Sequence, residues 1–143
     1  MNVLLDININ LSKSNPMKLI KLLPILLIMI SCVQETHLKT ITFKVDMNDI
    51  ENVSEVGIRG SFTSNPWKKT IFFSDEDSDG IYEGTLSLKT AHSRVEFKFV
   101  NQNDQFELQD QNNRSIEFES KPEIILYEDV FNNEKKTNIT KED

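Results

Sequence analysis

Cysteine is almost absent from this chain, which carries a single one, Cys32. One thiol cannot form an intramolecular disulfide or build a thiolate cage around zinc. Glycines number only four, and no glycine-rich phosphate loop is present. The two histidines, His37 and His92, accompany no recognisable nucleophile motif, and the carboxylates are too numerous for one pair to stand out. The sequence therefore predicts no enzyme and no cofactor.

Positively charged residues are outnumbered by negatively charged ones. The formal net charge is −7 over 143 residues, and the first 32 residues are basic, so the remainder is more acidic still. An acidic domain repels phosphate backbones, which argues against nucleic acid as a partner. The length is enough for one domain with one core.

The longest apolar run, LLPILLIMI at residues 22–30, is short. It falls below the roughly 20 residues that span a bilayer, so a transmembrane helix or a buried core helix is the less favoured interpretation. Lys18 and Lys21 precede the run and Cys32 follows it, an order typical of a signal peptide. Residues 28–32, IMISC, resemble the lipobox of a bacterial lipoprotein, which implies lipidation of Cys32.

These features predict an order of segments along the chain. We expect residues 1–16 to be an upstream extension before a start at Met17, and residues 17–31 to be the signal peptide. Residues 32–39 would be a tether, residues 40–131 the folded domain and residues 132–143 a disordered polar tail. The protein would then lie in the bacterial cell envelope, anchored to the membrane by lipid and facing the periplasm or the cell surface.

Alternation of apolar and polar residues dominates the folded segment. In residues 40–47, for example, Ile41, Phe43, Val45 and Met47 alternate with polar side chains, as in a strand with one buried face. Similar runs recur at 54–59, 70–74, 81–88, 94–100, 116–118 and 123–130, with turn residues between them. The pattern predicts an all-β, immunoglobulin-like β-sandwich of about seven short antiparallel strands.

Several motifs follow one another in a characteristic order between residues 40 and 120. They are ITFKVDMNDI, VGIRGSF, Trp67, an Asp-rich turn before GIYEGTLSL, VEFKFV, and Phe106-Glu107 with Asn113-Arg114. Together they resemble a starch-binding domain, as in family 20 carbohydrate-binding modules and the related glycogen-binding modules. The resemblance implies non-catalytic binding of an α-glucan such as starch or glycogen.

The resemblance also implies roles for individual residues. Trp67 and Phe106 would form an aromatic platform for glucose rings, and Lys98, Glu107 and Asn113 would hydrogen-bond the sugar hydroxyls. Phe106 stands where the family usually has tryptophan, and the segment between Glu107 and Asn113 is longer than usual. Both departures imply a smaller platform with an altered ligand preference.

The aromatic residues, taken alone, leave other roles open. Trp67 follows Asn65-Pro66 in a loop, where an indole either covers the edge of the sandwich or presents a face to a ring-shaped ligand. Phe106 lies between polar residues and could fold back into the core.

The polar candidates have ordinary alternatives as well. Lys98 could be a solvated strand lysine, and Glu107 and Asn113 could stabilise their loop through ion pairs and turn hydrogen bonds. We expect Arg114 to be structural rather than a ligand contact.

The segment DEDSDG at residues 75–80 resembles the first half of a calcium loop. An EF-hand needs a bidentate glutamate at position twelve, where this chain has Leu86. We therefore expect a β-turn and no metal site, with Asp75, Asp77 and Asp79 as the weak candidate.

One alternative function keeps the same sandwich. An envelope protein–protein interaction domain that has lost glycan binding would contact its partner through a strand edge or the acidic loop.

Overall fold

A computed structural model of the chain describes residues 34–142. All nine strands lie in one compact unit, Glu35–Asp143. The predicted upstream extension, the signal peptide and Cys32 lie outside the described residues. Within residues 34–142, no helix is long and apolar enough to cross a membrane.

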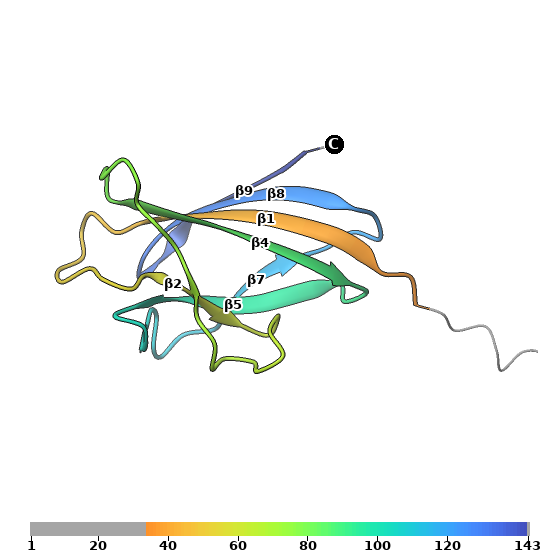
Figure 1. Cartoon of the computed structure of the whole chain (residues 1–143), viewed down its shortest axis with the longest axis horizontal. Coiled ribbons are helices and arrows are strands. Elements are labelled where there is room, and N and C mark those ends of the chain that lie inside the picture. The colour runs from red at the N-terminus through yellow and green to blue at the C-terminus, as the bar shows by residue number, and fades with distance from the viewer. Residues whose placement is uncertain (1–33, 143) are drawn as a thin grey trace, which may run out of the picture. The chain divides into compact units, whose positions relative to one another are not determined.

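The strands form two facing sheets (Figure 1). They are β1 (His37–Asp46), β2 (Gly57–Gly60), β3 (Ile71–Phe72), β4 (Ile81–Thr90), β5 (Arg94–Asn101), β6 (Gln105–Phe106), β7 (Arg114–Glu117), β8 (Glu123–Val130) and β9 (Asn133–Glu142). Sheet A has the order β4-β1-β8-β9, and sheet B has the order β3-β2-β5-β6 with β7 also paired to β5. The predicted all-β sandwich is confirmed. Residues 34–142 contain nine strands rather than about seven, in part because β3 and β6 have two residues each and are too short to show alternation.

One strand pair departs from the predicted antiparallel arrangement. β1 pairs with β8 in parallel, with Lys39 opposite Glu123 and Asp46 opposite Val130. The other pairs between the named strands are antiparallel. Alternation reports which face of a strand is buried, but it says nothing of which neighbour the strand takes or in which direction, so the sequence could not show this pairing.

The first strand begins before the predicted boundary at residue 40. β1 starts at His37, so the last three residues of the predicted 32–39 tether belong to the sheet. Lys39 is buried, and its Nζ donates to Glu119 O at 2.6 Å and to Glu123 Oε2 at 2.6 Å. A buried lysine breaks the apolar alternation that was used to place the start of the strand.

The predicted disordered tail at residues 132–143 is a strand over most of its length. β9 pairs with β8 antiparallel. Lys141 Nζ donates to Glu123 Oε1 at 2.7 Å, and Thr137 Oγ1 donates to Asp129 Oδ2 at 2.6 Å. Nearly every side chain of β9 is exposed, so its composition resembles that of a disordered segment. Its order comes from backbone pairing with β8 and from polar contacts such as these.

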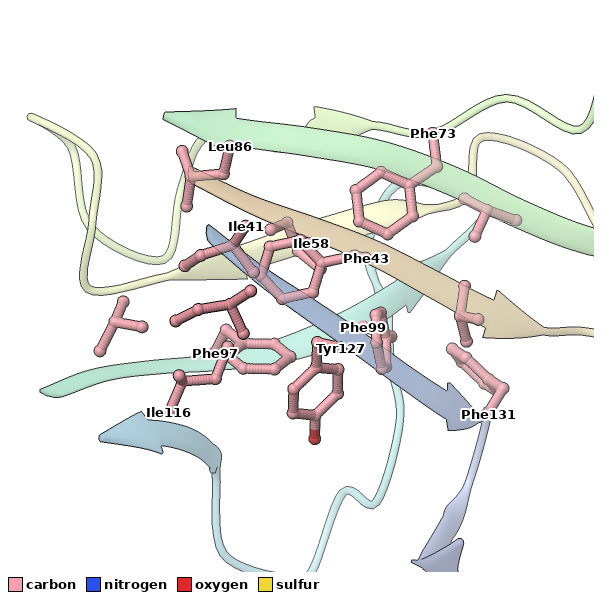
Figure 2. Close-up of a cluster of buried hydrophobic side chains, with 14 of the residues drawn as sticks. Ile41, Phe43, Ile58, Phe73, Leu86, Phe97, Phe99, Ile116, Tyr127 and Phe131 are labelled. Atoms are coloured by element: carbon pink, nitrogen blue, oxygen red, sulfur yellow. The ribbon is translucent and has the colours of Figure 1, made fainter. Parts of the chain in front are cut away.

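Aromatic side chains fill the space between the sheets (Figure 2). The Phe43 ring packs edge-on to Phe97 with centroids 5.1 Å apart and also contacts Phe73 and Tyr127. Because Phe97 and Phe99 of β5 face this core, Lys98 between them projects to the opposite face of sheet B. The outer face of sheet B therefore rests on a rigid aromatic layer.

Candidate functional site

The candidate site lies on the outer face of sheet B. Arg59 of β2 stands directly opposite Lys98 of β5, and their neighbours Ile58, Phe97 and Phe99 face the core. Residues 61–70 connect β2 to β3, and residues 102–113 connect β5 to β7 and include β6. These two loops carry the side chains that border the site.

Six residues line one hollow of about 300 Å³ on this face: Trp67, Lys98, Asp104, Phe106, Gln109 and Asn113. Four of the five residues that the sequence predicted for carbohydrate binding are thus brought together, although they are separated by up to 46 positions in the chain. Trp67 and Phe106 are partly exposed, and Asn113 is exposed. The arrangement combines two aromatic side chains with groups that can donate and accept hydrogen bonds.

Trp67 is held in an unusual backbone conformation. Its φ is 64°, in the left-handed region that a bulky residue rarely adopts. The Trp67 amide donates to Gly60 O at 3.1 Å, which closes the loop on itself. Trp67 belongs neither to the hydrophobic core nor to the side chains packed against it, so its indole is available at the surface of the loop.

Phe106 lies on β6, opposite Val100 of β5. The Arg59 guanidinium lies over the Phe106 ring, 5.6 Å from its centroid. Phe106 is likewise outside the hydrophobic core. The cation covers one face of the ring, so the ring is fixed in place while it lines the hollow.

Lys98 is buried rather than solvated. Its Nζ donates to Leu108 O at 2.5 Å and to Gln111 O at 3.0 Å, so the side chain holds the loop that borders the hollow. An ammonium group has three donors. The two bonds to the loop leave one donor for a ligand in the hollow.

The structure contradicts the predicted sugar contact of Glu107. Its side chain is fully buried, and its Oε1 accepts from Phe99 N at 2.9 Å and from Arg114 Nε at 2.6 Å. Glu107 does not line the hollow. Phe106 is the last residue of β6 and faces the hollow, whereas the side chain of Glu107 just after the strand is directed into the interior.

Arg114 is structural, as predicted. Its Nη1 donates to Asp129 Oδ2 at 2.5 Å, and this carboxylate oxygen also accepts from Tyr127 OH at 3.1 Å. Burial opposes the charged form of Arg114, but its bonds to Glu107 and its attraction to Asp129 raise the pKa of the guanidinium. Burial also raises the pKa of Tyr127 to about 12. This cluster ties the loop at residues 102–113 to sheet A.

Three residues of the site were not predicted from the sequence. Asp104 and Gln109 line the hollow, and Arg59 supports Phe106. Asp104 and Gln109 lie among many polar loop residues that carry no distinguishing pattern. Arg59 did carry a signal, because it is a cation on the outward face of a strand next to buried Ile58.

The acidic turn lies elsewhere. Carboxylate oxygens of Asp75, Asp77 and Asp79 lie within 4.8 Å of one another. The Asp75 carboxylate accepts from Asp79 N at 3.2 Å and from Gly80 N at 3.1 Å, and Gly80 takes a φ of 84°. These backbone bonds account for the predicted turn, and we assign it no metal.

No protein-family model and no curated protein matches the chain. Among solved structures, the chain is similar to CBM25-1 of the beta/alpha-amylase from Paenibacillus polymyxa, with 15% identity and a TM-score of 0.46 over 74% of this chain and 94% of that one. It is also similar to CBM25-2 of the same enzyme, with 12% identity and a TM-score of 0.45 over 75% of this chain and 95% of that one. A likeness at this level assigns neither a ligand nor a site residue to this chain.

Proposed function

We propose that the sandwich binds an α-glucan, such as starch or glycogen, without catalysing a reaction. The observation that carries the proposal is that Trp67 and Phe106 line one hollow together with Lys98 and Asn113. The C–H groups of a pyranose pack on aromatic faces, while its hydroxyls need donors and acceptors around the rim. The hollow supplies both.

The polar groups of the hollow suit neutral hydroxyls. Asn113 and Gln109 each offer an amide donor and a carbonyl acceptor, Asp104 offers acceptors, and Lys98 offers a donor. Neighbouring hydroxyls on one sugar ring both donate and accept, so a mixed set of this kind can satisfy them. The motifs that resemble starch-binding modules favour α-linked glucose over other sugars.

Binding without hydrolysis follows from the same residues. Glycoside hydrolysis uses a pair of carboxyl groups that flank the scissile bond. Among the described residues that line the hollow, Asp104 is the one with a carboxylate. With a platform of two aromatic side chains, we expect a dissociation constant in the range of roughly micromolar to millimolar, or about −8 to −4 kcal/mol.

Affinity electrophoresis tests the proposal. Residues 34–143, which contain the nine strands β1–β9 and the core that they enclose, would be run through native gels that hold glycogen, amylopectin, a β-linked mannan or no polysaccharide. We expect retardation in the α-glucan gels alone, with loss of retardation in Trp67→Ala and Phe106→Ala. Phe72→Ala is the matched control, because Phe72 is an exposed aromatic residue that lies outside the hollow. Equal mobility of the wild type in all four gels would refute α-glucan binding.

We also propose that the sandwich is tethered to a membrane of the bacterial cell envelope through a lipid on Cys32. The support is the order of lysines, apolar run and cysteine in residues 18–32. Labelling of the full chain with radioactive palmitate in a bacterial host should mark the wild type and not Cys32→Ser. Absence of label from the wild type would contradict the anchor.

The free edge of β9 favours one alternative, an envelope protein–protein interaction domain. Within residues 34–142, β8 is the one strand that pairs with β9, and nearly all of β9 is exposed. An open edge can receive a strand from another chain. Cross-linking to an envelope protein that Ile139→Lys abolishes, together with equal mobility in every glycan gel, would favour this function.

A further inference from the structure

Arg59 joins the two loops that carry the aromatic side chains. Its Nε donates to Thr70 Oγ1 at 2.7 Å, and its Nη2 donates to Asn103 O at 2.5 Å and to Asn103 Oδ1 at 3.1 Å. Thr70 Oγ1 in turn donates to Asn103 Oδ1 at 2.8 Å. We call these three residues, Arg59, Thr70 and Asn103, the loop clasp.

The clasp closes both ends of the loop that carries Trp67. Arg59 lies just before this loop and Thr70 ends it, so the bond between them fixes the separation of the two ends. Asn103 belongs to the other loop, three residues before Phe106. One side chain therefore ties the base of the Trp67 loop to the loop of Phe106, and the same guanidinium covers the Phe106 ring.

The backbone on both sides of the clasp is strained. Trp67 has a φ of 64°, and Gln102 and Asn103 have φ values of 50° and 61°. A residue such as Trp67 or Gln102 rarely holds this conformation unless its surroundings impose it, whereas asparagine adopts it more readily. The clasp provides that constraint at the ends of both strained segments.

The position of Arg59 does not favour stability by itself. Arg59 and Lys98 are like charges directly opposite each other on neighbouring strands, an arrangement that destabilises a sheet. Arg59 bonds to a hydroxyl, a carbonyl and an amide oxygen, whereas the buried Arg114 bonds to two carboxylates. Arg59 bonds to Asn103, and Lys98 bonds to Leu108 and Gln111. The two cations together therefore hold the loop at residues 102–113.

We propose that Arg59 is a positioning residue for glycan binding: through Thr70 and Asn103 it fixes Trp67 and Phe106 relative to each other before the ligand arrives. The inference rests on the proposed function. A preorganised platform loses less conformational freedom when the ligand binds, so loosening the clasp should weaken binding while the core remains folded.

Thr70 offers a matched pair of variants. Thr70→Val keeps the shape of the side chain but removes the hydroxyl, whereas Thr70→Ser keeps the hydroxyl. Arg59→Lys keeps the positive charge but places its donors on one nitrogen, so it cannot reproduce the separate bonds of Nε to Thr70 and of Nη2 to Asn103. We expect Thr70→Val and Arg59→Lys to behave alike and Thr70→Ser to behave like the wild type.

The first readout needs no glycan. Trp67 is the single tryptophan of the chain, so its fluorescence reports on its loop alone. Acrylamide quenching should increase, and fluorescence anisotropy should fall, in Thr70→Val and Arg59→Lys but not in Thr70→Ser. Unchanged quenching and anisotropy in Thr70→Val and Arg59→Lys would overturn the clasp.

The second readout is affinity for maltoheptaose, measured by calorimetry on the same proteins. We expect about tenfold weaker binding by Thr70→Val and Arg59→Lys, with recovery in Thr70→Ser. Wild-type affinity in Thr70→Val, despite a loosened Trp67, would overturn the role of the clasp in binding. If the wild type itself fails to bind maltoheptaose and to be retarded by glycogen, the proposed function fails, and the quenching data still decide whether the clasp positions Trp67.

Discussion

Arg114 and Glu107 form a buried ion pair with two parallel hydrogen bonds. Nε donates to Oε1 at 2.6 Å, and Nη2 donates to Oε2 at 2.8 Å. Glu107 follows Phe106 directly, so the residue that lines the hollow is anchored by its buried neighbour. Asn132 N also donates to Glu107 Oε2 at 3.3 Å. The loop of the candidate site is therefore fastened to the far sheet through one carboxylate.

Replacement of Glu107 should destabilise the fold rather than merely weaken binding. Glu107→Ala leaves Arg114 buried with one of its two carboxylate partners, and breaking a buried pair in this way costs about 3–5 kcal/mol. Urea unfolding measures the loss. Glu117→Ala, an exposed glutamate on β7, is the control and should change stability little. Normal stability of Glu107→Ala together with lost glycan binding would restore the ligand role that the sequence predicted.

Lys98→Met should affect both stability and binding. The substitution removes the donor that holds Leu108 O and Gln111 O, and hydrogen bonds to charged groups contribute about 1.5–3 kcal/mol each. The loop at residues 108–113 should loosen and affinity should fall. Lys89→Met, at an exposed position of β4, is the matched control. Full retention of stability in Lys98→Met would show that the two bonds contribute little.

Both aromatic residues of the platform could be predicted from the sequence, but the contacts that hold its loops in place could not. Trp67 and Phe106 were identified through the resemblance to starch-binding modules, because an aromatic residue among polar loop residues, taken alone, could also pack against the core. The contacts that Lys98 and Glu107 make could not be predicted, because a sequence motif gives the residue types but not the side to which each side chain points. Glu107 pairs with Arg114 and Lys98 binds loop carbonyls, and both arrangements depend on how the loop folds back over β5.

The same distinction applies to the fold. Alternation in β1 and β5 predicted a sandwich, since most residues on the core-facing side of each strand are apolar. It could not predict β9, whose burial pattern has no apolar face and whose order depends on pairing with β8.

Removal of β9 should destabilise the protein substantially. A chain that ends at Asn132 loses the Thr137 bond to Asp129 and the Lys141 bond to Glu123, both to buried carboxylates. At about 1.5–3 kcal/mol for each hydrogen bond to a charged group, the loss is about 3–6 kcal/mol. Thermal unfolding of the truncated chain tests this, with Lys135→Ala as a control for charge on β9. An unchanged melting temperature would support the disordered tail that the sequence predicted.

Acid should weaken the protein through Glu123. Burial alone would raise the pKa of Glu123, but hydrogen bonds from Lys141 and Lys39 hold the pKa below its ordinary value of 4.5. The unfolded chain therefore takes up the proton first as the pH falls. The stability that Glu123 contributes is present above pH 4.5 and is lost as the pH falls through the lower folded pKa.

Lys141→Met tests this dependence. The variant should lose more stability relative to the wild type at pH 7 than in acid below the folded pKa of Glu123, where the carboxyl is protonated and no longer attracts Lys141. Lys44→Met removes an exposed ion pair with Glu83 and should cost roughly 0–1 kcal/mol at pH 7. Equal losses for Lys141→Met at both pH values, measured by urea unfolding, would contradict the role of Glu123.

The parallel pairing of β1 with β8 has a consequence for how the chain folds. β1 is an inner strand of sheet A and pairs with β8. Lys39 of β1 and its partner Glu123 of β8 are 84 positions apart in the sequence. Contacts between segments so distant in sequence form slowly, because the intervening chain must first be ordered. When the chain emerges with its N-terminus first, β1 can pair with β4 as soon as residues 81–90 have emerged, but it must wait for residues 123–130 before it can pair with β8. The centre of sheet A can therefore close only after β8 has emerged.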